Sequence, residues 1–215
     1  MRQSTEQIIL YIRAGMTHLS ADISNDTLGF MDWLLDVAGE ELVSCPGGWL
    51  KTLNTFCAIM GWSTSAKKDG WSASSGRSGP KGKTAQNQVR ALEALVKFLQ
   101  IGFRQEEAIS STPRAYWDSL YRIPRDPHAF AYLNLTGARR DEDGEMYSDR
   151  ESRQRVFHKR FLDPVSKGVV QVRKDGGVTG RAAASLDQLL QDKEGGFGDY
   201  EVTTAMATED LLELW

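Results

Sequence analysis

A chain of 215 residues is long enough for one domain with a buried core, or for one domain with a long extension. With 26% charged and 40% hydrophobic residues it has the composition of a soluble globular protein, and its net charge of -3 argues against a surface built throughout to hold nucleic acid. Two cysteines, Cys45 and Cys57, are too few for a disulfide framework or a four-ligand zinc site.

The first segment with helical spacing of apolar residues predicts a helix from about Thr5 to Leu19. Its apolar residues recur at steps of four and three along one side: Ile8, Ile12, Met16 and Leu19. Ser4 with Gln7 matches a capping box, in which the two side chains satisfy backbone N–H groups at the start of a helix.

Ser20 can cap a second helix, and the apolar residues of this helix cover an unusually wide surface. Four of the residues after Ser20 share one side and three others broaden it: Ile23, Thr27, Phe30 and Leu34, then Leu28, Met31 and Leu35. So wide a surface predicts packing against more than one neighbour.

Two further amphipathic helices follow. Pro46 and two glycines break the chain, after which a third apolar stripe ends at Gly61: Trp49, Leu53, Phe56, Cys57 and Met60. Thr84 can cap a fourth helix with one apolar face: Leu92, Leu95, Val96, Leu99 and Phe103. Helices of ~15 residues joined by tight turns cannot bury their faces alone, so they indicate an all-α bundle or α-solenoid. The wide second helix favours the solenoid.

Residues 63–83, between the third and fourth helices, are rich in Ser, Gly and Lys and predict a loop. One negative residue, Asp69, stands among five cations: Lys67, Lys68, Arg77, Lys81 and Lys83. These cations are candidates for contact with an acidic surface or a phosphate backbone. A solvated linker is the alternative, and it is the commoner role of such loops.

Residues 105–215 alternate short elements with irregular stretches, which is typical of an extension that wraps a partner. Prolines interrupt the chain at several points. Short extended runs are predicted over residues 129–135 and 169–172, and a turn is predicted at Asp175-Gly176-Gly177. A helix is expected from about Arg181 to Gln191. The C-terminal end is acidic, with Asp199, Glu201, Glu209, Asp210 and Glu213.

A helix predicted over 149–162 carries a basic face: Arg150, Arg153, Arg155, Lys159 and Arg160. This face is a candidate for RNA or partner contact. The alternative is that these cations pair with the acidic end of the chain or are simply solvated, which is more frequent in helical proteins.

The tryptophans divide into two groups. Trp33, Trp49 and Trp62 are interpreted as packing residues of helices rather than as a platform for nucleic-acid bases. Trp71, Trp117 and Trp215 lie outside predicted helices. We expect their side chains to be buried at the interface with a partner protein and to anchor it.

No motif in the sequence predicts a catalytic, metal or cofactor site. The three histidines, His18, His128 and His158, are far apart, and the phosphate-loop, dinucleotide and zinc-protease patterns do not occur. The N-terminus does not have the pattern of a secretory signal, and no apolar run approaches ~20 residues. We therefore expect neither secretion by that route nor insertion into a membrane.

One run of residues resembles a known family. Leu10-Tyr11-Ile12, Met16-Thr17-His18 and Asp22-Ile23 are similar to the signature of a pre-rRNA-processing subunit of the Rix complex, a family named for processing of the second internal transcribed spacer. Later helices continue the resemblance over about 7–104: Trp49-Leu50 with Leu53, Gly61-Trp62, then Leu92, Leu95, Phe98, Leu99 and Gly102.

The resemblance implies an armadillo or HEAT-like α-solenoid fragment over 1–104, followed by the largely irregular extension 105–215. Family chains have further helices before the Leu-Tyr-Ile motif, so a fragment is expected. It also implies a non-enzymatic nuclear scaffold, in nucleolus and nucleoplasm, for maturation of the large (60S) ribosomal subunit. The partners implied are a larger helical-repeat subunit, a β-propeller subunit, the AAA+ ATPase midasin and the pre-60S particle, with no cofactor, membrane or small-molecule substrate. An RNA-binding helical-repeat module is the alternative.

Overall fold

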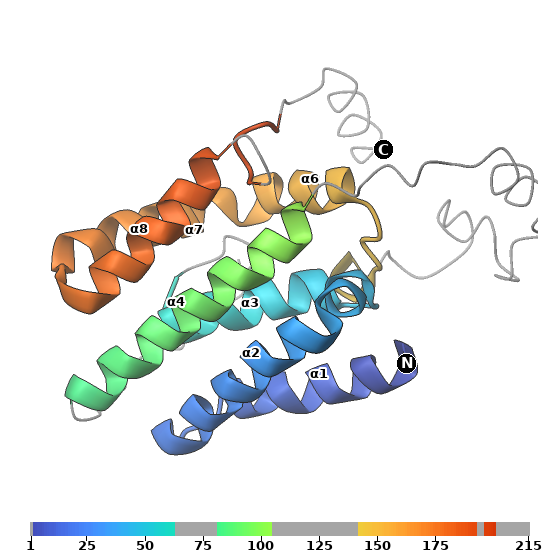
Figure 1. The fold of residues 1–215 in the computed structure, drawn as a ribbon. Helices are drawn as coiled ribbons and strands as arrows, with labels where there is room; N and C mark the ends of the chain where they lie inside the picture. Colours follow the sequence, from blue (N-terminus) through green and yellow to red (C-terminus); the bar gives the residue numbers. More distant parts are fainter. Residues whose placement is uncertain (1, 63–80, 105–141, 193–195, 201–215) are drawn as a thin grey trace, which may run out of the picture.

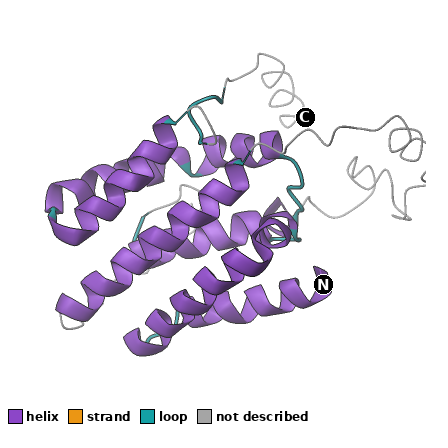
Figure 2. Cartoon of the chain, viewed as in Figure 1, coloured by secondary structure: helices purple, strands orange, loops and turns teal. Residues whose placement is uncertain are grey.

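The computed structural model describes residues 2–62, 81–104, 142–192 and 196–200, and within these ranges every regular element is a helix (Figures 1 and 2). The helices are α1 Arg2–Met16, α2 Ala21–Ser44, α3 Gly48–Met60, α4 Lys81–Phe103, the short 3-10 helix η2 Glu142–Gly144, α6 Arg150–Arg160, α7 Leu162–Asp175 and α8 Gly177–Gln191. The predicted all-α class is confirmed.

The helices form two layers. α2, α4 and α8 lie side by side with α4 in the middle, while α1, α3 and α7 form the other layer (Figure 1). Within each of the pairs α1–α2, α3–α4 and α7–α8 the two helices also contact each other. Helical hairpins that stack in this way bury faces that no single hairpin could bury. The armadillo or HEAT-like classification of this stack stays a prediction.

Glycines set the ends of α3 and the turn between α7 and α8. Gly61 has a φ of 71°, and the Gly61 and Trp62 N–H groups bond to the carbonyls of Ala58 and Cys57, which closes α3 as predicted. Gly176 and Gly177 have φ values of 72° and 73°, so the predicted turn is confirmed.

Two predicted caps and one predicted strand are wrong. α1 and α4 begin at Arg2 and Lys81, so Ser4 and Thr84 lie inside these helices rather than at their starts. Residues 169–172 belong to α7, because Val165 and Val169 are buried one helical turn apart against neighbouring helices. This packing outweighs the preference of β-branched residues for strands.

The predicted apolar faces of α1 and α2 are confirmed only in part. In α1, Ile12 and Met16 are buried as predicted and Ile9 joins them, while Ile8 is exposed and Leu19 lies beyond the helix and is exposed. In α2 the core receives Leu28, Met31, Leu34 and Leu35, together with Leu42 and Val43. Ile23, Phe30 and Trp33, which the sequence assigned to packing, are exposed instead.

An aromatic cluster joins the two halves of the chain. Trp49 of α3 stacks on Phe98 of α4 with ring centres 5.0 Å apart, and Phe103 at the end of α4 meets Phe157 of α6 at 5.3 Å. Phe197 packs on both Phe103 and Phe157. The described part of the predicted wrapping extension therefore folds onto α3 and α4 and shares their core.

Candidate interaction surfaces

The basic helix α6 begins at a well-formed cap. The Asp149 carboxylate accepts a hydrogen bond from the Ser152 N–H at 2.9 Å, the N-cap arrangement that satisfies a free N–H at a helix start. Burial would by itself raise the pKa of Asp149, but the hydrogen bonds from Ser152 and the charge of Arg153 outweigh it and hold that pKa below its ordinary value.

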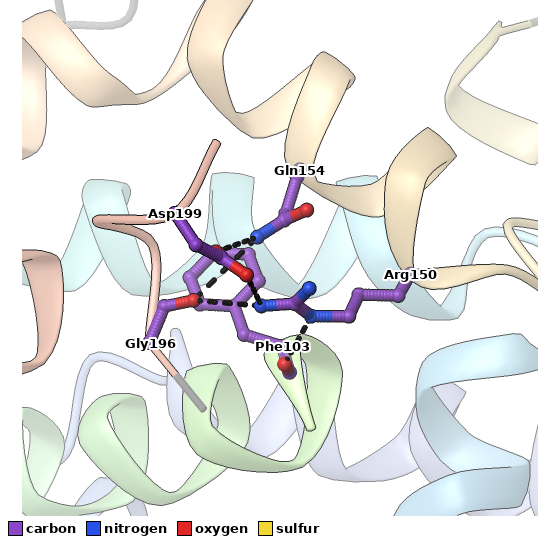
Figure 3. Close-up of polar contacts among 5 residues, drawn as sticks. All are labelled: Phe103, Arg150, Gln154, Gly196 and Asp199. Atoms are coloured by element: carbon purple, nitrogen blue, oxygen red, sulfur yellow. Dashed lines mark hydrogen bonds and ion pairs between the residues drawn. The ribbon is translucent and has the colours of Figure 1, made fainter. Parts of the chain in front are cut away.

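Arg150 connects three segments of the chain (Figure 3). Its Nε donates to the Phe103 carbonyl at 2.6 Å, and its Nη2 pairs with the Asp199 carboxylate at 2.6 Å and reaches the Gly196 carbonyl at 3.3 Å. Gln154 donates to the other oxygen of Asp199 at 3.0 Å. For Arg150 and Asp199, the predicted pairing of the basic face with the acidic end is confirmed.

Arg153 lies inside the molecule, with 4% of its surface exposed. Its guanidinium donates to the carbonyls of Gly102, Tyr147 and Ser148 at 2.8, 3.0 and 2.8 Å. In return, the Arg153 carbonyl accepts from the Trp49 indole at 3.2 Å. These bonds fasten α6 to the end of α4 and to α3, so the Arg153 side chain acts inside the fold.

The remaining cations of this face lie nearer to solvent. Arg160 pairs with Asp143 of η2 at 2.9 Å. Arg155 is half-buried and Lys159 is exposed. The sequence pattern had grouped all five cations of α6, whereas the structure distributes them between internal contacts and the surface.

Most of the other predicted contact residues lie outside the described part of the chain. These are Lys67, Lys68, Trp71, Arg77, Trp117 and Trp215. Lys81 and Lys83 fall in the first turns of α4, and their side chains are likewise outside the described part. A role for these residues in partner or RNA contact stays a prediction.

Chemically reactive groups do not converge in the described residues. No three of their His, Cys, Asp and Glu side chains come together as a metal site would require. Burial raises the pKa of the Cys57 thiol to about 12, and burial together with the charge of Glu6 raises that of Cys45, so both thiols are protonated at neutral pH. His158 stacks against Phe197 and contacts the Tyr200 ring at a tilt.

None of the helices that the structure describes combines the length with the apolar composition that crossing a bilayer requires.

An open groove of about 610 Å³ runs between α4 and α8. Its lining mixes aliphatic and charged side chains, including Val96, Lys97, Val178, Arg181 and Ala182. This mixture resembles a surface furrow rather than a closed substrate pocket.

The surface that the sequence missed is formed by α1 and α2. Tyr11, Phe30, Trp33 and Val37 are 76, 63, 56 and 64% exposed, with Ile8 and Ile23 beside them at lower exposure. Large apolar side chains gathered on one face commonly mark a contact site. The signal was present in the sequence as the wide apolar surface of the second helix, of which one side enters the core and the other faces outward.

Comparisons with known proteins agree on one family. A family described as "Rix1 complex component involved in 60S ribosome maturation" matches residues 1–99. The chain is 50% identical over 195 residues to the Pre-rRNA-processing protein IPI1 of Chaetomium thermophilum, which covers 89% of this chain and 58% of that protein.

Two further relatives carry the same name. The protein of Pyricularia oryzae is 47% identical over 213 residues, covering 94% of this chain and 61% of the relative. That of Neurospora crassa is 48% identical over 203 residues, covering 89% and 56%. The chain thus spans less than two thirds of the length of each relative. With about half of the residues shared along nearly its whole length, this chain belongs to the family described as Rix1 complex components involved in 60S ribosome maturation.

Proposed function

We propose that this chain is part of a non-enzymatic scaffold subunit of a nuclear complex that matures the large ribosomal subunit and processes the second internal transcribed spacer. The observation that carries the proposal is the 47–50% identity to proteins named for pre-rRNA processing, which extends over 89–94% of the chain. The likeness therefore includes α6, α7 and α8 as well as the N-terminal helices.

The organisation of the described residues supports a scaffold. Two layers of helices offer outer faces and an open groove between α4 and α8, and the polar contacts of Arg150 and Arg153 hold helices together. Exposed apolar residues on α1 and α2 form a surface on which a further element can pack.

The finer parts of the proposal follow from the family. The complex would contain a larger helical-repeat subunit and a β-propeller subunit, and it would act on the pre-60S particle in nucleolus and nucleoplasm. Within that complex, the chain would help recruit the AAA+ ATPase midasin. No cofactor or small-molecule substrate is needed for such a role.

Direct RNA binding is the weaker alternative. Arg150, Arg153 and Arg160 of the basic helix are engaged by Asp199, backbone carbonyls and Asp143. An RNA site would therefore depend mainly on the cations of 63–83. RNA binding through several phosphates would weaken steeply with rising salt, and neutralising the cations of 63–83 would flatten that slope.

Depletion of the protein that contains this chain tests the proposal. RNA blots with a probe for the second internal transcribed spacer should show accumulation of spacer-containing precursors and loss of mature large-subunit rRNA. Re-expression of the wild-type protein should reverse both changes. Unchanged precursor levels in depleted cells would refute the proposed function.

A further inference from the structure

A short segment that follows α8, residues 196–200, lies across the ends of three helices, and we name it the strap. Its Phe197 packs on Phe103 at the end of α4 and on Phe157 of α6, with ring centres 5.6 and 5.3 Å apart. The Phe197 N–H also bonds to the Leu189 carbonyl of α8 at 3.2 Å. The strap therefore contacts α4, α6 and α8 together.

Two side chains of the strap are held in different ways. Phe197 is a buried anchor with 7% of its surface exposed. Asp199 lies nearer to solvent, and each of its carboxylate oxygens meets a different donor (Figure 3). Arg150 pairs with one oxygen at 2.6 Å, and Gln154 donates to the other at 3.0 Å. Buried aromatic rings and arginine pairs are the contacts that commonly dominate recognition between proteins.

The walls of this site are held by contacts that do not involve the strap. The Arg150 Nε donates to the Phe103 carbonyl at 2.6 Å, which orients the guanidinium independently of Asp199. α6 itself is fixed by the carbonyl bonds of the Arg153 guanidinium and by the bond from the Trp49 indole. The site should therefore keep its shape when the strap leaves it, and a preorganised site binds a ligand at lower entropic cost.

The strap is less firmly held than the helices beneath it. The side chains of its ion pair, Arg150 and Asp199, are 17 and 26% exposed, so water and salt weaken that pair. Phe197 is the one large side chain of the strap that is buried. Because segments with few buried apolar contacts open at a lower free energy than the core, the strap should open while the helices stay folded.

The backbone of the strap defines the peptide that fits this site. An added Cβ at Gly196 or Gly198 would lie 2.3 or 2.4 Å from a carbonyl oxygen of α8, so both positions require glycine. The Tyr200 N–H bonds to the Phe197 carbonyl at 3.0 Å, and this turn brings the aromatic and acidic side chains to the same site. The matching ligand is a turn-forming peptide with an aromatic residue between two glycines and a carboxylate two positions after that residue.

We propose that the ends of α4, α6 and α8 form a peptide-binding site, which the strap fills within its own chain and a segment of a partner protein fills when the strap opens. The partner segment places an aromatic ring against Phe103 and Phe157 and a carboxylate on Arg150. A lysine or arginine in place of that carboxylate does not fit, because the guanidinium of Arg150 repels it.

The assignment of the ligand to a partner protein rests on the proposed scaffold function. Peptide binding is measured on the purified chain, whereas spacer processing is measured in cells. A failure of one is therefore distinguishable from a failure of the other.

Fluorescence anisotropy tests the site on the full chain with its strap disabled. The receptor is the variant Phe197→Ala, Asp199→Ala, and the probe is a labelled peptide with the sequence of residues 194–202. The receptor variant should bind this peptide at least about 10-fold more tightly than the wild type does. In the wild type the strap competes at the high effective concentration of a tethered ligand.

Substitutions in the peptide and in the receptor test the two anchors separately. Phe197→Ala or Asp199→Asn in the peptide should each weaken binding about 10-fold. In the receptor, Arg150→Gln should have the same effect. The matched control is Arg160→Gln on the same helix, which should leave binding unchanged because Arg160 pairs with Asp143 instead.

Hydrogen exchange on the wild-type chain is a second measurement, which does not depend on the folding of any variant. The N–H groups of Phe197 and Gly198 bond to the carbonyls of Leu189 and Asp192. They should exchange at least about 10-fold faster than the buried part of α4, because the strap opens without global unfolding.

Three results would overturn the proposal: no binding of the peptide to a folded receptor variant, equal binding of the peptide that carries Phe197→Ala, or strap exchange as slow as that of α4. A dimer of the wild-type chain, seen by sedimentation, that the Phe197→Ala, Asp199→Ala variant dissociates would also overturn it. That result would assign the site to the strap of a second copy.

Discussion

The guanidinium of Arg153 donates to carbonyls of Gly102, Tyr147 and Ser148 while almost no part of the residue is exposed. Replacing Arg153 by Met keeps the bulk but leaves these buried acceptors without donors. Since hydrogen bonds to a charged group contribute ~1.5–3 kcal/mol, we expect a loss of about 3 kcal/mol in the free energy of unfolding. Urea denaturation measures it.

The matched control is Lys159→Met on the same helix, where the side chain is exposed. It should change the free energy of unfolding by less than ~0.5 kcal/mol. Equal effects of the two substitutions would mean that Arg153 is not the internal link described above.

Asp149 predicts a pH dependence of stability. Its pKa lies below the ordinary value in the folded chain, so its ionised form stabilises the fold fully above about pH 4, the ordinary pKa of an aspartate, and this contribution is lost progressively as the pH falls below that value and through the lower pKa of the folded state. Asp149→Asn keeps a capping side chain but removes the charge. The stability difference between wild type and variant should therefore be larger at pH 6 than at pH 3, as measured by urea titration. An equal difference at both pH values would contradict this.

The sequence predicted that five cations share one face of α6, but not which of their side chains point into the fold. Periodicity placed the five cations on one helix, and the charge balance suggested pairing with the acidic end. The acceptors that draw Arg153 inward are the carbonyls of Gly102, Tyr147 and Ser148, and their positions depend on the tertiary packing of α4 and of the segment between η2 and α6. No local pattern encodes that packing.

Two helical glycines, Gly102 and Gly29, differ in the space that a side chain would find at their positions. Gly102 of α4 lies under the Trp49 ring, and an added Cβ would be 2.3 Å from that ring. Trp49 is fully buried and its indole N–H is bonded to the Arg153 carbonyl, so it cannot easily move. Gly102→Ala should therefore lower the melting temperature, because overpacking costs ~1–3 kcal/mol and outweighs the gain in helix propensity.

Gly29 of α2 is the matched control. It is exposed, and a Cβ there would meet no atom within 4 Å. Gly29→Ala should raise the melting temperature, since alanine favours a helix over glycine by about 1 kcal/mol. Shifts of the same sign for both substitutions, measured by calorimetry, would contradict the packing of α4 on α3.

The presence of the four helices in residues 1–104 was predictable from the spacing of apolar residues, while some helix starts, the helix α7 and the choice of buried face were not. The prediction selected Ile8 for the core, yet Ile9 is buried, because both positions fit a helical stripe and only the neighbouring helices decide between them. The stripes of α3 and α4 were correct since each has one clear apolar side. In α7, the run of valines predicted a strand and the packing of Val165 and Val169 made it helical.

The aromatic cluster makes a prediction for the whole molecule. Trp49, Phe103 and Phe157 connect α3, α4 and α6, so the two halves of the described chain should unfold together. Urea denaturation followed by tryptophan fluorescence and by far-ultraviolet circular dichroism should give one transition with one midpoint. Separate transitions, as an independent extension would give, would show that the halves do not share a core.

The central claim is that this chain contributes surface rather than chemistry to a ribosome-assembly complex. Affinity purification of the tagged protein from nuclear extract, followed by quantitative mass spectrometry, tests it most directly. We predict strong enrichment of a larger helical-repeat subunit, a β-propeller subunit and pre-large-subunit particles over an untagged control. Recovery of a folded protein with none of these would contradict the claim.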